Sequence, residues 1–308
     1  MSASIVQISI VIPTYGRDEV LVQTIEDLLK CDPLAMELLV IDQTPQHAAD
    51  TEQRLHELHD AERIRWIRQS PPSITRAMNR GLMEARSPIV LFVDDDIVPA
   101  SGLLGAHAVA HEDGGLTAVV GQVIQPWQQP ADVAAACPRS GLLADLDFPF
   151  FSTRADDVYN VMAGNLSVKR DHAIACGGFD ENFVGAAYRF ETEFARRILN
   201  RGGRIRFAPS ASLKHLRSER GGTRSQGSHL TSADPVHGVG DYYFALLHGW
   251  RVDVIRYVFR RMIREVCTKF HLRHPWYIPV KLVGEVRALC WAWQLHRRGP
   301  ALIRRPVP

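Results

Sequence analysis

The sequence predicts an α/β fold, with a central and mostly parallel sheet flanked by helices and a helical extension after it. Apolar runs typical of strands alternate with helical patterns between residues 8 and 93, as in strand–helix–strand units. These runs are continuously apolar, which is typical of strands buried on both faces. Polar residues follow directly after three of the runs. Because α/β sheets bind ligands at the carboxyl ends of their strands, we expect a site there.

The elements of the first half each follow from a local pattern. The first strand ends at Pro13, and Asp18 is placed to cap the helix that follows it. That helix has its apolar residues on one face. The predicted order is strand 8–12, a helix to about residue 29, strand 38–41, a polar helix 51–60, strand 64–67, helix 73–85 and strand 89–93.

The second half is less regular. Its patterns predict strand 116–124, a long loop 125–158, strand 161–168, helix 190–200, a short strand 205–207 and a Gly/Ser/Arg-rich loop 217–229. From about residue 236 onward the pattern is helical, with a break near 275–279. The 308 residues exceed the usual size of one domain. We therefore predict a main domain at 1–235 and a helical extension at 236–308.

Charge is spread unevenly along a chain of ordinary globular composition. Hydrophobic residues make up 46% and charged residues 23%, which excludes a disordered or collagen-like chain. The net charge is only +2, but residues 249–308 hold 13 Lys and Arg against 3 Asp and Glu, together with four of the six tryptophans. A basic, Trp-rich helical segment suits an anionic membrane surface; the alternative is a helix packed on the main domain with its arginines reaching solvent. No nucleic-acid-binding pattern accompanies the charge, so we expect no nucleic-acid partner.

The five cysteines have no metal-binding spacing, which indicates free thiols in a reducing compartment. Apolar runs stay well short of the roughly 18 residues that a membrane span needs. The N-terminal segment lacks the basic region of a secretory signal. We therefore expect a cytoplasmic protein, peripheral on the cytoplasmic face of the membrane if the extension binds lipid.

The acidic triplet Asp94-Asp95-Asp96, directly after the strand at 89–93, is the strongest chemical signal. In extended backbone Asp94 and Asp96 point to the same side. Two carboxylates on one side suit a hard divalent ion, Mg²⁺ or Mn²⁺, of the kind that bridges to phosphate oxygens. The alternative is a solvated loop that caps the next element. By contrast, His107 and His111, four residues apart, are interpreted as a solvated helix face.

Several motifs resemble the family 2 glycosyltransferases, which are nucleotide-sugar transferases of the Rossmann-like GT-A fold. The resemblance covers about residues 5–220, and the acidic triplet matches the DxD motif of that family. The motifs are SIVIPTYGR, ELLVIDQT, PIVLFVDDDIVP, AGNLSVKR, GGFDENF and FETEFARRI, in the family's order.

The resemblance implies a donor site. Pro13, Thr14 and Tyr15 would surround the base and ribose, and Asp42 would accept a hydrogen bond from the base. Arginines would reach the diphosphate from a helix and from the glycine-rich loop; the alternatives are a solvated helix face and a surface loop. The complete implied donor set is Pro13, Thr14, Tyr15, Asp42, Arg76, Asp94, Asp95, Gly164, Asn165, Arg220 and Arg224.

It also implies a metal site and an acceptor side. Asp96 and His215 would hold the metal, while Asp94 would face the ribose or a metal-bound water. A histidine after a strand is otherwise an ordinary surface or core residue. Asp180 and Glu181 in GGFDENF would lie near the acceptor or donor sugar; the alternative is a glycine turn with capping carboxylates.

Glu191 would be the general base, in place of an Asp that the family carries, and Phe190 replaces the usual acidic neighbour. Glu193 is the second candidate if the helix starts later. An acidic pair that complements the helix dipole is the alternative interpretation of both.

These roles imply an inverting, metal-dependent transfer of a sugar from a nucleotide diphosphate to an acceptor hydroxyl, in polysaccharide or glycolipid synthesis. The partners would be the nucleotide-sugar donor, a glycan or lipid-linked acceptor and the membrane surface. The departures at Phe190 and Glu191 leave an inactive nucleotide-sugar-binding relative as one alternative. A nucleotidyltransferase and a scaffold that docks through its basic extension are the others.

Overall fold

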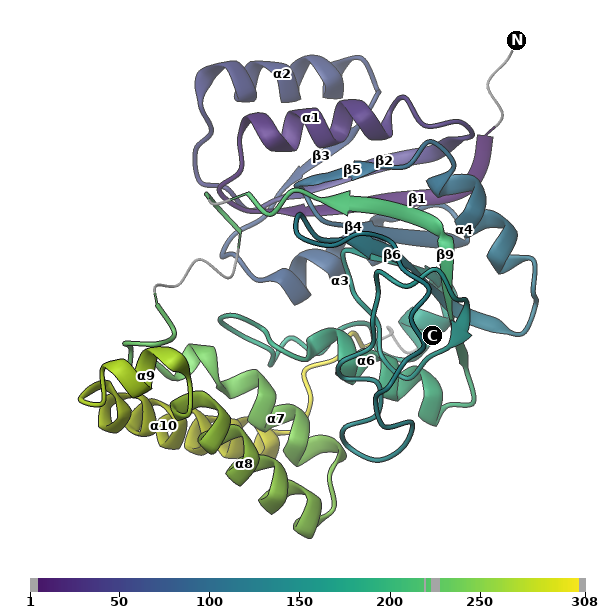
Figure 1. Ribbon diagram of the computed structural model, residues 1–308. Helices are drawn as coiled ribbons and strands as arrows, with labels where there is room; N and C mark the ends of the chain where they lie inside the picture. Colours follow the sequence, from purple (N-terminus) through teal and green to yellow (C-terminus); the bar gives the residue numbers. More distant parts are fainter. Residues whose placement is uncertain (1–4, 219, 223–227, 305–308) are drawn as a thin grey trace.

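The computed structural model describes residues 5–218, 220–222 and 228–304, which form a mixed α/β fold around one large sheet (Figure 1). The elements of the first half are β1 (Ile5–Thr14), α1 (Glu19–Leu28), β2 (Leu34–Asp42), α2 (Ala49–Asp60), β3 (Arg65–Arg68), α3 (Ile74–Glu84), β4 (Ile89–Val93), β5 (Ile97–Pro99), α4 (Leu103–His111) and β6 (Leu116–Ile124). Those of the second half are β7 (Asp156–Asp157), β8 (Asn165–Lys169), α5 (Arg170–Ala175), α6 (Phe190–Asn200), β9 (Arg204–His215), a 3₁₀ turn (Pro235–His237), α7 (Val239–His248), α8 (Arg251–Val266), α9 (Lys269–Arg273) and α10 (Tyr277–Arg298).

The sheet order is β3-β2-β1-β4-β8-β6-β9-β5, with β7 paired to β9. Strands β3, β2, β1 and β4 are parallel, as the alternating pattern predicts. The other half is mixed, because β8 runs antiparallel to both of its neighbours and β5 antiparallel to β9. The predicted α/β class with a central flanked sheet is confirmed, and its parallel character is strongest in the first four strands.

Helices cover both faces of the sheet and create two cores. On one face, α1, α2 and α4 bury Leu21, Leu55 and Leu104 against β1, β2 and β4. On the other, α3, α6 and α7 pack Met78, Phe194 and other large side chains on the same sheet. This double covering is why the strands read as continuous apolar runs. In Figure 1, α1 and α2 lie above the sheet and α3 and α6 below it.

Three local predictions need correction. Asp18 stands at the start of α1 but does not cap it, because its carboxylate accepts from the Ala48 N–H at the start of α2 instead. The predicted strand 161–168 begins only at Asn165, after a turn. The strand expected at 205–207 continues to His215, because β9 pairs with β6 along its length.

The loop 125–158 is not a solvated insertion. Phe148 and Phe150 are buried and pack edge-on against Phe207 of β9. The loop therefore forms part of the hydrophobic core that covers the second half of the sheet.

The C-terminal helices share a core with the main domain. Tyr243 and Phe244 of α7 and Ala292 of α10 belong to the same buried cluster as Phe194 of α6. After α10 the chain returns to the main domain, where the Ile303 N–H donates to the Gly177 carbonyl. The division at residue 235 stays a prediction, since the core is continuous across it. Among the described helices, none combines the length and the apolar character needed to cross a bilayer.

Candidate active site

The carboxyl ends of β1, β2 and β4 meet at one edge of the sheet, and β9 ends there as well. The β1–β2 register pairs Thr14 with Asp42, so both strands finish at the same level. The β5–β9 register pairs Ile97 with His215, and the Leu216 N–H donates to the Asp96 carbonyl at 2.7 Å. Sheet pairing, not sequence proximity, therefore places His215 beside the acidic triplet.

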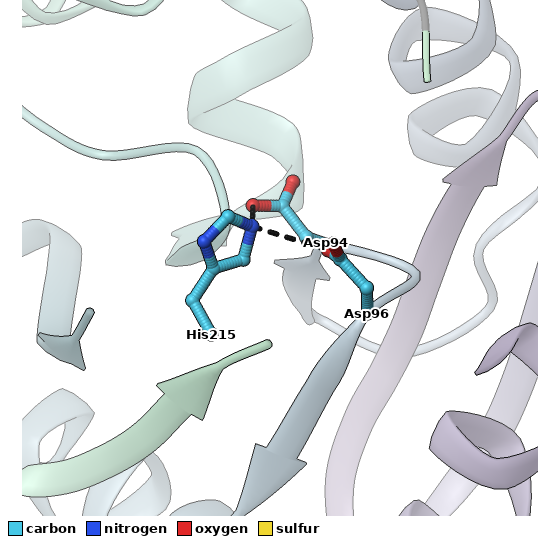
Figure 2. A group of neighbouring side chains, drawn as sticks. All are labelled: Asp94, Asp96 and His215. Carbon is cyan, nitrogen blue, oxygen red and sulfur yellow. Dashed lines mark ion pairs between the residues drawn. The ribbon is translucent and has the colours of Figure 1, made fainter. Parts of the chain in front are cut away.

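Asp94, Asp96 and His215 form a cluster that fits a cation (Figure 2). One potential ligand atom from each lies within 4.8 Å of the others. His215 Nε2 lies 3.1 Å from Asp96 Oδ1 and 3.7 Å from Asp94 Oδ2. Asp94 and Asp96 thus lie on one side as expected, although they belong to the bend between β4 and β5 and not to an extended strand.

Gly164 makes room for this cluster. A Cβ atom at this position would lie 2.3 Å from Asp94 Oδ2, so any larger residue would displace the carboxylate. The expected place of Gly164 near the donor is consistent with this contact. Its neighbour Asn165 is different: the Asn165 amide is buried and donates to the Gln122 and Ala211 carbonyls. The Asn165 side chain is therefore engaged within the sheet, and its contacts do not support the expected donor-binding role.

The electrostatics of the cluster favour bound positive charge. Although burial opposes ionisation, hydrogen bonds from His215 and the Ser218 N–H hold the pKa of Asp96 below its ordinary value. Burial also opposes charging of His215, but Asp96 and the charge of Asp94 raise its pKa. The two carboxylates thus favour positive charge on the neighbouring imidazole.

Asp95 points away from this cluster, toward the end of β1. It accepts from Thr14 Oγ1 at 2.7 Å and from Arg17 Nε at 3.3 Å. Burial raises the pKa of Asp95 to about 7, against the opposing charge of Arg17. Asp95 therefore holds the β1 turn in place, and direct donor contact, as first expected, has no support in its contacts.

Arg17 is a site residue that the sequence reasoning missed. Its guanidinium is buried, and its Nη2 atom lies 3.2 Å from Asp96 Oδ2. Arg17 also donates to the carbonyls of Ser218 and Arg220. The motif PTYGR contains it, but only the fold reveals that it links the acidic triplet to the glycine-rich loop.

The described part of the glycine-rich loop lies over the β1 turn. The Gly222 N–H donates to the Tyr15 carbonyl at 2.7 Å. A Cβ on Gly221 would lie 2.2 Å from the Gly16 carbonyl oxygen, so this close approach requires glycine. Arg220 is exposed, whereas Arg224 lies outside the described residues. The loop therefore covers the segment that holds Pro13, Thr14 and Tyr15.

Asp42 is fully buried, and protein groups surround its carboxylate. Its Oδ1 accepts from the Thr44 N–H, and its Oδ2 lies within 2.9 Å of His47 Nε2 and Trp66 Nε1. Burial opposes ionisation, but these bonds hold the pKa of Asp42 below its ordinary value. Asp42 thus organises the end of β2, and the expected hydrogen bond to a base would need a remaining lone pair. His47 is a second residue that the sequence reasoning missed.

The expected acceptor-side residues divide into a buried and an exposed member. Asp180 is buried and accepts from Tyr243 Oη at 2.8 Å and from the Ala301 N–H at 2.9 Å. It therefore anchors the C-terminal segment, and its contacts do not support the expected acceptor role. Glu181 is partly exposed, and its Oε2 lies 3.9 Å from Arg76 Nε. Arg76 thus faces Glu181, and no described contact joins it to the acidic cluster.

The two candidate bases on α6 also differ in their burial and their partners. Glu193 is buried and forms a bidentate ion pair with Arg197 at 2.6 and 2.7 Å. Burial opposes its charge, but His248 and Arg197 hold the pKa of Glu193 below its ordinary value. A carboxylate neutralised in this way is a poor proton acceptor. Glu191 is half-buried in the first turn of the same helix, and it stays the candidate base.

His107 and His111 are buried, so their interpretation as a solvated helix face was wrong. His107 Nε2 lies 2.8 Å from Asn165 Oδ1, and both histidines contact Ser167 Oγ at 2.8 Å. Burial lowers the pKa of each to about 4, so both are neutral hydrogen-bonding groups inside the core.

Comparison with known proteins agrees with this geometry. Residues 9–131 match the family described as "Glycosyl transferase family 2". This part of the chain is therefore similar to the family 2 glycosyltransferases. No curated protein matches the chain in sequence.

Solved structures of low sequence identity share the fold. GalNAc-T7, in a structure with UDP, GalNAc and Mn²⁺, aligns at a TM-score of 0.57 and 14% identity over 80% of this chain. This chain spans only 50% of GalNAc-T7. The mannosyltransferase PcManGT from Pyrobaculum calidifontis, with GDP-Man and Mn²⁺, aligns at 0.52 and 16% identity, covering 95% of this chain and 79% of that one. S. aureus TarS 1-349 with UDP-GlcNAc aligns at 0.56 and 14% identity, covering 92% and 73%. These matches confirm the GT-A fold.

Proposed function

We propose that this protein is an inverting, divalent-metal-dependent transferase that moves a sugar from a nucleoside-diphosphate donor to an acceptor hydroxyl. The observation that carries the proposal is the cluster of Asp94, Asp96 and His215 at the carboxyl end of the sheet. Two carboxylates and an imidazole converge there, and Gly164 leaves them room. The family match and the fold support the class of reaction.

The possible ligand atoms of Asp94, Asp96 and His215 fit Mg²⁺ or Mn²⁺. Carboxylate oxygens suit both ions, and an imidazole nitrogen is more typical of Mn²⁺ than of Mg²⁺. Asp96 and His215 would hold the ion, with Asp94 beside them. When bound, the ion would neutralise negative charge on the departing nucleoside diphosphate.

The protein's own groups would position and activate the reactants. Glu191 would accept the proton of the acceptor hydroxyl as that oxygen bonds to the anomeric carbon and the bond to the diphosphate breaks. Arg220 and the rest of the glycine-rich loop would lie over the diphosphate and exclude water. Thr14 and Tyr15, which this loop contacts, would line the nucleotide side.

The related structures contain UDP, GDP-Man and UDP-GlcNAc, two of them with Mn²⁺. We propose a nucleotide-sugar donor of this kind for this chain. We also propose a glycan or lipid-linked acceptor, in the synthesis of cell-surface polysaccharide or glycolipid.

A thermal-shift screen tests the donor site. UDP, GDP, TDP and CDP are each added with and without Mn²⁺ to the wild type, to Asp96→Ala and to the control Asp171→Ala, whose side chain is exposed on α5. We expect a Mn²⁺-dependent rise in Tm with one nucleotide, because a ligand that binds only the native state stabilises it. The shift should be lost in Asp96→Ala alone. The absence of any shift in the wild type would refute the donor site.

A turnover assay separates an enzyme from an inactive binding relative. Glu191→Gln should keep the nucleotide-induced shift and lose donor turnover, whereas the exposed control Glu112→Gln should keep both. Release of pyrophosphate from a nucleoside triphosphate would instead identify a nucleotidyltransferase.

A further inference from the structure

The outward face of α8 carries a continuous apolar stripe. Val252, Ile255, Phe259 and Ile263 follow one another at helical spacing, and each is between 57% and 63% exposed. Trp250, just before the helix, is 84% exposed. Side chains three and four residues apart share a helix face. A helix that exposes its apolar stripe is unusual for a soluble surface, because such patches mark binding sites.

A second stripe lies on α10. Val283, Val286 and Trp293 are each about half exposed and share one helix face, while Ala288 and Ala292 are buried on the opposite face. Both stripes therefore face away from the core. Figure 1 shows α8, α9 and α10 grouped at the end of the molecule farthest from α1 and α2.

An ionic cluster fixes these orientations. Arg261 on the inner side of α8 lies between Asp241 of α7 and Glu285 of α10, with an Nε–Oε2 distance of 3.0 Å to Glu285. Lys281 Nζ lies 3.0 Å from Glu285 Oε1. These groups are almost fully buried, so rotation of either helix would strip charges of their partners. The apolar stripes are thus held outward by the fold.

The charge around the stripes is basic. Arg256, Arg260 and Arg264 are exposed in a row next to the α8 stripe, each one residue beyond a stripe member. Arg287, Arg297 and Arg298 are exposed along α10. The acidic residues of these two helices offset only part of this charge, because Glu285 is buried and the Glu265 side chain, which pairs with Lys281 and with Arg264, is 17% exposed. The remaining one, Asp253, lies in the first turn of α8.

We propose that the outer face of α8, α9 and α10 binds the surface of an anionic lipid bilayer. Exposed apolar and Trp side chains would enter the boundary between headgroups and acyl chains, and the arginines would meet lipid phosphates. The exposed apolar side chains and the exposed arginines lie side by side, which suits a bilayer better than a protein partner or a nucleic acid. No described helix could cross the bilayer, so the contact is peripheral. The inference is independent of the proposed transfer reaction.

The chain after α10 is joined directly to the main domain. The Ala301 N–H donates to Asp180, and Leu302 and Ile303 pack against Gly177 and Gly178 of the GGFDENF segment. Binding at the helical face would thus hold the main domain at a fixed distance from the membrane.

Vesicle co-sedimentation of the full chain tests the proposal. The probes are vesicles of phosphatidylcholine alone and of phosphatidylcholine with an equal part of phosphatidylglycerol. The apolar variant is Ile255→Ser/Phe259→Ser/Ile263→Ser, and the charge variant is Arg256→Gln/Arg260→Gln/Arg264→Gln. Their matched controls change exposed residues elsewhere: Met36→Ser/Met83→Ser/Val109→Ser and Arg63→Gln/Arg80→Gln/Arg86→Gln.

We expect wild type and both controls to bind the anionic vesicles and not the neutral ones. The charge variant should bind on the order of 100-fold more weakly, and added salt should weaken the wild type in the same way. The apolar variant should lose at least about tenfold. Tryptophan emission of the wild type should shift to the blue on the vesicles as exposed indoles enter the boundary. Unfolding curves check that each variant is folded.

The proposal would be overturned if the wild type did not bind anionic vesicles. It would also be overturned if the apolar variant and the charge variant both bound as well as the wild type. If sedimentation equilibrium shows a wild-type dimer, and only the apolar variant is a monomer, the face would be assigned to a second copy of the chain. Tighter binding to single-stranded DNA than to anionic vesicles at the same ionic strength would assign it to a nucleic acid. The nucleotide thermal shift is read separately, so failure of one proposal leaves the other standing.

Discussion

The ionic cluster between α7, α8 and α10 and the acidic cluster at the sheet edge both hold buried carboxylates, but they balance the negative charge differently. In the helical cluster, Asp241 pairs with Arg189 and Arg261, and Glu285 pairs with Arg261 and Lys281. Every one of these carboxylates therefore has a basic partner from another position in the fold.

At the sheet edge, three successive carboxylates of the triplet share Arg17 and His215. Arg17 serves Asp95 and Asp96, while Asp94 lies 3.7 Å from His215 and is 46% exposed at its side chain. This difference in charge balance distinguishes carboxylates that stabilise the fold from carboxylates of a candidate site. Buried carboxylates matched by fixed cations hold elements together, whereas a partly exposed carboxylate such as Asp94, beside Asp96 and His215, is accessible to a cation from solution.

Removing the central cation of the helical cluster should have the largest effect. Arg261→Gln leaves Asp241 and Glu285 buried with fewer partners, which should lower the free energy of unfolding by about 3–5 kcal/mol. Urea unfolding measures this, with the exposed neighbour Arg260→Gln as control. Because the site is elsewhere, turnover per folded molecule should stay close to wild type. Equal stability of the two variants would contradict the scaffold role.

Asp96→Asn should affect activity much more than stability. We expect activity to fall on the order of 100-fold or more, because the metal would lose a charged ligand. The free energy of unfolding should fall by less than in Arg261→Gln, by about 1–3 kcal/mol, because Asn keeps an acceptor for the Ser218 N–H but loses the charge that pairs with Arg17. EDTA should abolish wild-type activity, and Mn²⁺ should restore it. Full activity in EDTA would refute metal dependence.

Gly164→Ala probes the room around the acidic cluster without changing its charge. The new methyl group would meet Asp94 Oδ2, so Mn²⁺ affinity should fall roughly 10-fold or more. Gly102→Ala is the control, because its methyl group would enter open space. Titration calorimetry with Mn²⁺ and a nucleoside diphosphate compares the two. Unchanged affinity in Gly164→Ala would show that Asp94 does not contribute to binding.

The smallest effect should be the pH dependence contributed by His47. Burial opposes its charge, but Asp42 and Asp18 raise the pKa of His47 in the folded state. Its contribution to stability is then complete below about pH 6.5 and lost as pH rises through the raised folded-state pKa. Unfolding of wild type and His47→Gln from acid to alkaline pH should converge as pH rises. A constant difference across this range would contradict the ion pairs.

Local patterns were enough to predict the main strands and helices but not β5, α4, β7 or α5. Continuous apolar runs identified β1, β2 and β4, and the sequence also predicted that Asp94 and Asp96 lie on the same side in the candidate metal cluster. The resemblance to a family brought His215 into the set. The helical pattern after residue 236 was also correct.

Contacts between distant segments could not be predicted in this way. Arg17 and His47 carry no local signal, yet each bonds carboxylates of the site. Asp42 and Asp180 were expected to meet ligands, but partners from other elements occupy them. The resemblance ranked Glu191 ahead of Glu193, and only the tertiary contacts with Arg197 and His248 show that the Glu193 carboxylate is engaged.

The sequence by itself determined the fold class, the strand ends where the chemistry gathers, and the basic, Trp-rich character of the C-terminal helices. These properties depend on side-chain periodicity and composition, which act over a few residues. Only the tertiary structure decided which carboxylates are neutralised, and which face of α8 remains outside. Both depend on partners far apart in the chain, such as Arg261 with Asp241 and His215 with Asp96, that meet only when the sheet and helices pack.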